Sequence, residues 1–110
     1  MLNVGVIGYG YWGPNIVRNF NIATGSKVVK VCDCNTEALK RLNKIYPEIP
    51  VTPDSEDLIR SGETDVVAIV TPVFTHYELA KKALLNGKHV FVEKPFTYTT
   101  DQAEELIELA

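Results

Sequence analysis

The sequence predicts an α/β fold in which one parallel sheet lies between two layers of helices, a doubly wound three-layer domain. Five short apolar stretches alternate with stretches of helical character along the 110 residues, an order typical of successive βα units. The fourth stretch, residues 65–70, is almost continuously apolar, as expected of a central parallel strand that helices cover on both faces. The length fits one domain, residues 1–110.

The predicted strands, in chain order, are residues 2–7, residues 27–32, a weak strand around Ile49 and Val51, residues 65–70, and residues 89–92. Helix punctuation separates them. We expect Gly25 to end the first helix, Asn35 to cap the second, Asp54 to cap the third, and Asn86 with Gly87 to end the fourth.

The end of the sequence predicts a further helix. Thr99 and Gln102 have the spacing of a capping box. No Gly, Asn or Pro follows in the segment that ends at Ala110. We therefore expect this helix to be interrupted by the end of the chain, before any second domain begins.

Composition and charge exclude several classes of protein. Hydrophobic residues make up 45% and charged residues 23%, the balance of a folded globular domain. The net charge of −3, without a run of Lys or Arg, argues against nucleic-acid and membrane partners. No signal peptide or membrane span is recognisable, and Cys32 and Cys34 form neither a disulfide framework nor a metal-ligand set. These features favour the cytoplasm.

The strongest motif is Gly-Tyr-Gly-Tyr-Trp-Gly at residues 8–13, directly after the first predicted strand and before a helical stretch. This is G-x-G-x-x-G in the strand–turn–helix context of a Rossmann-type dinucleotide site. Gly8 permits the tight turn, Gly10 lets a pyrophosphate approach the backbone, and Gly13 lets the helix pack close to the strand. The motif predicts a dinucleotide-binding domain.

The backbone N–H groups of Tyr11 and Trp12 are the expected phosphate donors, aided by the helix dipole. Pro14 fits the first helical turn, where a missing N–H costs no hydrogen bond. We expect the helix to begin near Gly10.

Asp33 stands at the end of the second predicted strand, twenty residues after Gly13. A carboxylate there can accept hydrogen bonds from both hydroxyls of the adenosine ribose and repels a 2′-phosphate. The sequence thus favours NAD as the cofactor, while Lys40 and Arg41 keep NADP as the alternative. By itself, Asp33 is equally compatible with a loop or helix-cap residue.

With these residues in view, the sequence resembles the Gfo/Idh/MocA family of glucose–fructose oxidoreductase and inositol 2-dehydrogenase. Besides the glycine turn and Asp33, the resemblance rests on two further motifs: Thr71-Pro72-x-x-x-His76 after the fourth strand and Glu-Lys-Pro at residues 93–95 after the fifth. It covers essentially the whole chain. Family members are about three times as long, which implies that an α+β substrate domain is absent from this chain.

The resemblance also implies roles for these residues. Thr71, Pro72 and His76 would line the cofactor along its ribose and nicotinamide, although His76 could instead be a helix-terminal residue bonded to backbone. Glu93 and Lys94 would approach the nicotinamide and the substrate. Lys94 is the catalytic candidate, either as the base that removes the hydroxyl proton or as a cation that stabilises a developing alkoxide.

The segment from Gly10 to Asn15, with Arg18-Asn-Phe20, resembles family members that act on nucleotide sugars or inositol. We therefore expect an oxidoreductase that transfers hydride between a nicotinamide cofactor and a polyol, sugar or nucleotide sugar, and a full-length protein that forms homo-oligomers. A methyltransferase shares the glycine turn and the acid but has no use for the Glu-Lys-Pro motif. The other alternative is a stand-alone nucleotide-binding or sensing module without catalysis.

Overall fold

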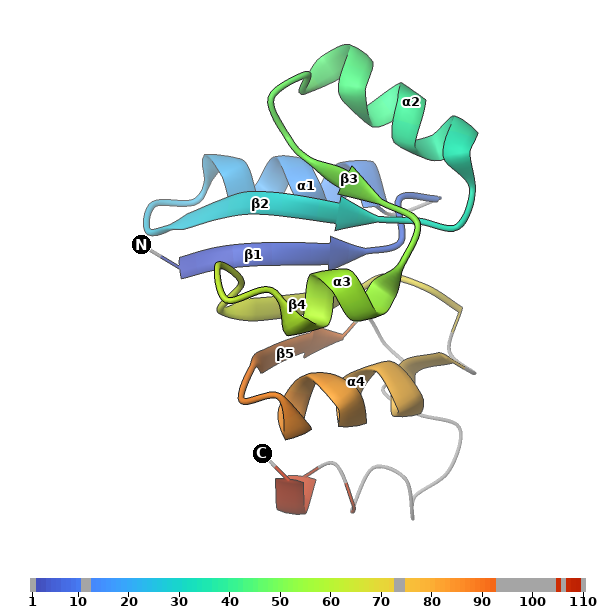
Figure 1. Cartoon of the computed structure of the whole chain (residues 1–110). Helices are drawn as coiled ribbons and strands as arrows, with labels where there is room; N and C mark the ends of the chain where they lie inside the picture. The colour runs from blue at the N-terminus through green and yellow to red at the C-terminus, as the bar shows by residue number, and fades with distance from the viewer. Residues whose placement is uncertain (1, 11–12, 73–74, 93–104, 106, 110) are drawn as a thin grey trace.

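The computed structural model describes residues 2–10, 13–72, 75–92, 105 and 107–109. The strands are β1 (Leu2–Ile7), β2 (Ser26–Cys32), β3 (Val51–Thr52), β4 (Val66–Ile69) and β5 (His89–Val92). The helices are α1 (Gly13–Ile22), α2 (Thr36–Ile45), α3 (Ser55–Arg60) and α4 (His76–Leu85). Strands and helices alternate along the chain (Figure 1), which confirms the predicted α/β class.

All five strands are parallel, in the order β3-β2-β1-β4-β5. From β1 the chain moves outward to β2 and β3, and then returns to the other side of β1 for β4 and β5. The direction of winding therefore reverses between β1 and β4. In open α/β sheets, ligands bind at this reversal, beyond the carboxyl ends of the strands.

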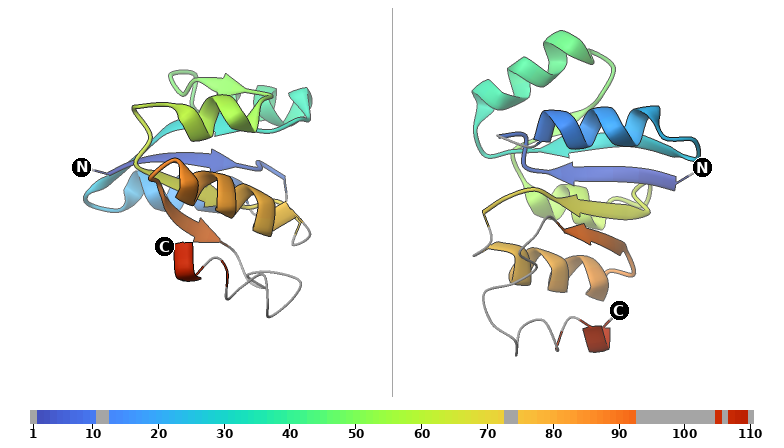
Figure 2. Two further views of the ribbon diagram at one scale, coloured as in Figure 1. Left: turned by 60° about the horizontal axis from the view of Figure 1, so that its bottom comes forward. Right: turned by 180° about the vertical axis from the view of Figure 1, so that it is seen from behind.

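The sheet is the middle of three layers, with α1 on one face and α3 on the other (Figure 2). Each face has its own apolar core. The core on the α1 side joins strands β1, β2 and β4 to α1 and α2, and includes Val4, Val6, Val28, Val31, Ile16, Val17, Leu39 and Leu42. The core on the other face joins β1, β2 and β4 to α3 and α4, and includes Ile7, Val67, Ile69, Leu58, Ile59, Ala80 and Ala83. Burial on both faces is what the apolar strands predict.

Strand β4 confirms the expectation for residues 65–70. Val67, Ala68 and Ile69 are each 0% exposed, and β4 pairs with β1 on one side and β5 on the other. Its position is interior, although the middle strand of the sheet is β1.

The predicted helix punctuation is also present. The side chains of Asn35 and Asp54 cap α2 and α3 by accepting hydrogen bonds from the second residue of each helix. Gly87 directly follows the C-cap of α4 with φ +74°. Gly25, with φ +96°, lies three residues beyond the end of α1 at Ile22. Left-handed backbone favours glycine at both places.

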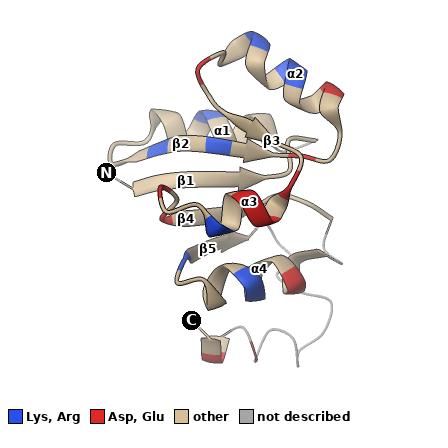
Figure 3. Cartoon of the chain, viewed as in Figure 1, with Lys and Arg blue, Asp and Glu red and all other residues tan. Residues whose placement is uncertain are grey.

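In Figure 3, each of α2, α3 and α4 has a red segment near its start and a blue segment further along, so both signs of charge occur on every one of these helices. A diphosphate would therefore depend on local donors for its binding. Among the described residues, no helix is long and apolar enough to cross a membrane.

Residues 105 and 107–109 are helical, as the pattern at the end of the sequence predicts. Glu105 accepts hydrogen bonds from Tyr77 and Lys81 of α4.

Candidate functional site

The glycine turn leaves β1 at Gly8, which has φ +104°. Its N–H donates to the carbonyl oxygen of Cys32 at the end of β2, at 2.7 Å. A Cβ at this position would lie 2.8 Å from the carbonyl oxygen of Val70. Both the left-handed backbone and this close contact require glycine, in agreement with the tight turn that the motif predicts.

Gly13 and Gly10 differ in what surrounds them. A Cβ on Gly13 would lie 2.6 Å from the carbonyl oxygen of Gly8, whereas a Cβ on Gly10 would meet no atom of the described residues within 4 Å. Gly13 therefore serves close packing of α1 on the turn, and Gly10 leaves an open approach to the backbone. Helix α1 is described from Gly13 onward, close to the expected start near Gly10. Tyr11 and Trp12, the expected phosphate donors, lie outside the described residues.

Asp33 directly follows β2, and both of its carboxylate oxygens accept hydrogen bonds from backbone. Oδ2 accepts from the N–H of Tyr9, in the glycine turn, and Oδ1 accepts from the N–H of Asn35, each at 2.8 Å. The side chain is half-buried rather than enclosed. The carboxylate expected at the ribose thus lies against the glycine turn.

The Thr71-Pro72 segment leaves β4 and is folded back on itself by side-chain hydrogen bonds. The hydroxyls of Thr71 and Thr75 lie 2.5 Å apart, and the Thr75 hydroxyl donates to the carbonyl oxygen of Pro72 at 2.6 Å. His76 begins α4 and is 2% exposed. Its Nε2 lies 2.7 Å from the carbonyl oxygen of Thr71. Because a carbonyl can only accept, Nε2 carries the proton and donates.

This contact is the one expected of a helix-terminal residue bonded to backbone, and the role of His76 at the cofactor stays a prediction. Its imidazole holds the loop after β4 in place.

A cavity of about 180 Å³ brings the motifs together at the reversal between β1 and β4. Its wall combines the glycine turn, the end of β2, the start of α3 and the loop after β4. The lining residues are Ile7, Gly8, Cys32, Asp33, Cys34, Pro53, Ser55, Thr71 and Leu79. The sequence predicted that Gly8, Asp33 and Thr71 would converge here.

The sequence did not identify Cys34, Ser55 and Leu79 as wall residues. Cys34 adjoins Asp33 and could have been inferred from that neighbour alone. Ser55 and Leu79 belong to helices α3 and α4, and no local motif marks either of them. Only the way these helices pack against the sheet brings them to the cavity.

A larger hollow of about 640 Å³ lies at the edge of β2, near Lys27, Tyr46 and Pro50. It is remote from the carboxyl ends of the strands, and none of the sequence motifs reaches it. The smaller cavity is therefore the candidate functional site, because Gly8 of the glycine turn and Asp33 both line it.

The two cysteines beside Asp33 differ in environment. Cys32 is buried and Cys34 exposed. Burial, reinforced by the nearby negative charge of Asp33, raises the pKa of the Cys32 thiol to about 12, so this thiol remains protonated at neutral pH and is a poor nucleophile. Within the described ranges, no group of three or more His, Cys, Asp or Glu side chains could hold a metal ion.

The Glu93-Lys94-Pro95 motif lies outside the described residues, immediately after β5. Strand β5 itself ends at Val92, beside Ile69 of β4. The motif thus follows the strand next to β4, the strand that Thr71 follows. The roles of Glu93 and Lys94 stay predictions.

Comparison with known proteins identifies a family. Residues 2–110 match the family described as "Oxidoreductase family, NAD-binding Rossmann fold". Among curated relatives, a glycosyl hydrolase family 109 protein from Shewanella sp. (strain ANA-3) is 32% identical over 99% of this chain and 26% of its own length. Inositol 2-dehydrogenase from Azotobacter vinelandii is 33% identical over 97% of this chain and 32% of its own length.

Solved structures show the same fold. Biliverdin reductase from Synechocystis sp. PCC 6803, with biliverdin and NADP⁺, superimposes with a TM-score of 0.93 at 27% identity, over 99% of this chain and 34% of that one. GenD2 of gentamicin A biosynthesis, with NAD, superimposes with a TM-score of 0.92 at 25% identity, over 99% of this chain and 31% of that one. UDP-N-acetylglucosamine 3-dehydrogenase GnnA from Acidithiobacillus ferrooxidans superimposes with a TM-score of 0.86 at 33% identity, over 99% of this chain and 33% of that one. This chain therefore spans about a quarter to a third of the proteins it matches.

Proposed function

The chain belongs to the Gfo/Idh/MocA family of oxidoreductases, and from this premise we propose that it binds NAD as the cofactor domain of a dehydrogenase. The enzyme would transfer hydride between the nicotinamide and a hydroxyl of a sugar, nucleotide sugar or inositol-like substrate. Members of this family are NAD(P)-dependent dehydrogenases. Family membership leaves open the choice between NAD and NADP and the substrate class. These two points are what we propose.

One observation carries the proposal: Gly8, Asp33 and Thr71 line a single cavity at the carboxyl ends of β1, β2 and β4. The residues around this cavity fit a dinucleotide. Gly10 has open space where a side chain would be, so a diphosphate can approach the backbone there. The start of α1 adds a helix N-terminus, whose partial positive charge favours an anion.

The preference for NAD rests on Asp33. A carboxylate beside the adenosine ribose accepts from the 2′- and 3′-hydroxyls, and it repels the phosphate that NADP carries at the 2′ position. Lys40, the nearest lysine along α2, lies 3.4 Å from the Glu37 carboxylate. Both side chains of this pair are exposed, so the pairing is weak, and Lys40 and Arg41 keep NADP as the alternative.

The chemistry needs a proton removed from the substrate hydroxyl while a hydride leaves the same carbon. When bound, the nicotinamide supplies the hydride acceptor. Lys94 is the residue that we assign to the substrate oxygen, as base or as electrostatic stabiliser. Two relatives support the proposed substrate class by their names, an inositol 2-dehydrogenase and a UDP-N-acetylglucosamine 3-dehydrogenase.

A second candidate is a nucleotide-binding module without catalysis. Such a module would need no substrate site, and the fold alone does not decide between binding and catalysis. Both candidates require the same cofactor site, and they differ only in turnover.

The test is calorimetric titration of the chain with NADH and NADPH. We expect NADH to bind at least about tenfold more tightly, since a 2′-phosphate would meet the Asp33 carboxylate. Failure of both to bind at millimolar concentration would refute the proposed function, and equal affinities would refute the NAD preference. Oxidation of inositols and UDP-sugars by the full-length protein, lost in a Lys94→Ala variant that still binds NADH, would separate the dehydrogenase from the binding module.

A further inference from the structure

Asp33 has two hydrogen bonds that the ribose does not explain. Its Oδ2 accepts from the backbone N–H of Tyr9, and its Oδ1 accepts from the backbone N–H of Asn35, both at 2.8 Å. Tyr9 lies between the first two glycines of the turn. The carboxylate therefore joins the glycine turn after β1 to the segment after β2.

This connection continues into α2. The Asn35 side chain accepts from the N–H of Glu37 at 3.0 Å and so caps that helix. At the residue before Asp33, the carbonyl oxygen of Cys32 accepts a hydrogen bond from the N–H of Gly8 at 2.7 Å. Successive residues at the end of β2 thus hold two successive N–H groups of the turn, those of Gly8 and Tyr9.

The side chain of Tyr9 also holds the turn in place. The Tyr9 side chain is 2% exposed, within the apolar core beneath α1. Its ring carbon Cδ1 lies 3.3 Å from the place that a Cβ on Gly13 would take. The side chain of Tyr9 is thus held by the core, and its N–H is held by the Asp33 carboxylate.

We propose that Asp33 is a positioning residue for the glycine-rich turn, and that it fixes the backbone on which the diphosphate binds. This inference rests on the proposed function and adds to the ribose contact given there. An ionised carboxylate has about four acceptor positions. Two are used by Tyr9 and Asn35, and two are left for the ribose hydroxyls.

For a ligand without ribose hydroxyls, the two roles of Asp33 predict opposite changes in binding affinity when the carboxylate is removed. If the carboxylate acted only on the ribose, its removal would take a negative charge away from a bound diphosphate and would leave binding unchanged or tighter. If the carboxylate also positions the turn, its removal weakens binding of the diphosphate itself. ADP and 2′,3′-dideoxy-ADP separate these effects.

The experiment measures the affinities of both nucleotides by calorimetry for the unsubstituted chain, Asp33→Ala and Asp33→Asn. We expect Asp33→Ala to lower the affinity for dideoxy-ADP by about fivefold or more, the scale of one hydrogen bond. The affinity for ADP should fall further. Asp33→Asn should also weaken dideoxy-ADP, because its single carbonyl oxygen cannot replace both carboxylate oxygens. The amide proton of Tyr9 should exchange slowly in the ligand-free chain and faster in both variants.

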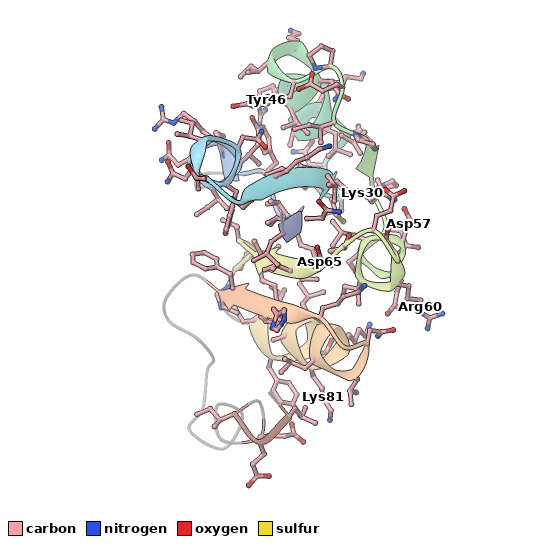
Figure 4. All side chains as sticks on the ribbon, turned by 90° about the vertical axis from the view of Figure 1, so that its left-hand side faces the viewer. Lys30, Tyr46, Asp57, Arg60, Asp65 and Lys81 are labelled. Carbon is pink, nitrogen blue, oxygen red and sulfur yellow. The ribbon has the colours of Figure 1, made fainter. Side chains whose placement is uncertain are left out.

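Asp65 provides a matched control, at the opposite end of the sheet. Its Oδ2 accepts from the backbone N–H of Asn3 at 2.8 Å, and Figure 4 shows it at the amino ends of the strands. Asp65→Ala also removes one carboxylate-to-backbone bond and one charge. It should leave the affinities for both nucleotides unchanged.

Dideoxy-ADP that binds Asp33→Ala as tightly as the unsubstituted chain, or more tightly, would overturn the inference and leave the proposed function intact. Rapid exchange of the Tyr9 amide in the ligand-free chain would overturn it as well. Absence of ADP binding by the unsubstituted chain would instead remove the proposed function, and the inference with it.

Discussion

Gly13 stands so close to Gly8 that a Cβ on Gly13 would lie 2.6 Å from the Gly8 carbonyl oxygen. That oxygen belongs to backbone, which cannot move aside as a flexible side chain would. We predict that Gly13→Ala lowers the free energy of unfolding by about 1–3 kcal/mol, the usual cost of overpacking. Urea denaturation followed by circular dichroism measures the change.

Gly62→Ala is the control for this substitution. Gly62 has no positive φ, and its Cβ would meet no atom within 4 Å. We expect a change within about 0.5 kcal/mol for this surface position. Equal denaturation midpoints for the Gly13 and Gly62 variants would show that the contact between Gly13 and Gly8 is easily relieved.

Gly10→Ala should separate binding from stability. The space around Gly10 is open, so a methyl group there costs the ligand-free fold little. The same methyl group would stand where a diphosphate meets the backbone. We predict unfolding within about 0.5 kcal/mol of the unsubstituted chain, together with NADH affinity at least about tenfold weaker by calorimetry. Unchanged NADH affinity would place the diphosphate elsewhere.

The glycines show which parts of the site a sequence can reveal. Gly8, Gly10 and Gly13 follow a fixed spacing after a strand, and the structure gives each a geometry that agrees with its expected role. Gly5 carries no such spacing. It is favoured at this position because a Cβ would lie 2.7 Å from the Leu58 side chain, on a helix that is far away in sequence.

The same limit applies to Asp33 and His76. Their positions could be predicted, since each follows a strand at a characteristic distance from other motif residues. Their hydrogen-bond partners could not, because the N–H of Tyr9 and the carbonyl of Thr71 come to them only through the folded turns. Tertiary contacts of this kind have no local signature in the sequence.

Gly5→Ala tests the packing of α3 against β1. Leu58 is 0% exposed, so its side chain has no free space into which to move. We predict a loss of about 1–3 kcal/mol in the free energy of unfolding. Adding Leu58→Ala should cost less in the Gly5→Ala background than in the unsubstituted chain, because the small side chain relieves the contact. Additive losses in this double-mutant cycle would contradict the close contact.

Alkylation of cysteine reports on the cavity. Cys34 is exposed and lines the cavity with Asp33, whereas Cys32 is buried with a raised pKa. We predict that iodoacetamide at pH 8 labels Cys34 in the folded chain and spares Cys32, since the thiolate is the reactive form. NADH should slow the labelling of Cys34, as measured by peptide mass spectrometry. Labelling at the same rate with saturating NADH would show that the cofactor does not cover this side of the cavity.

The buried thiol of Cys32 should make stability depend on pH in the alkaline range. Its pKa rises from 9.0 to about 12 on folding, first because burial disfavours the thiolate and then because Asp33 lies nearby. A pKa raised in the folded state contributes stability that is complete below about pH 9 and is lost as pH rises towards 12. In a Cys34→Ser background, we therefore predict that the chain with Cys32 loses about 1 kcal/mol more between pH 8 and pH 10 than the Cys32→Ala variant. Urea denaturation at both pH values measures this difference, and parallel losses in the two proteins would mean that the Cys32 thiol ionises as readily in the folded chain as in the unfolded one.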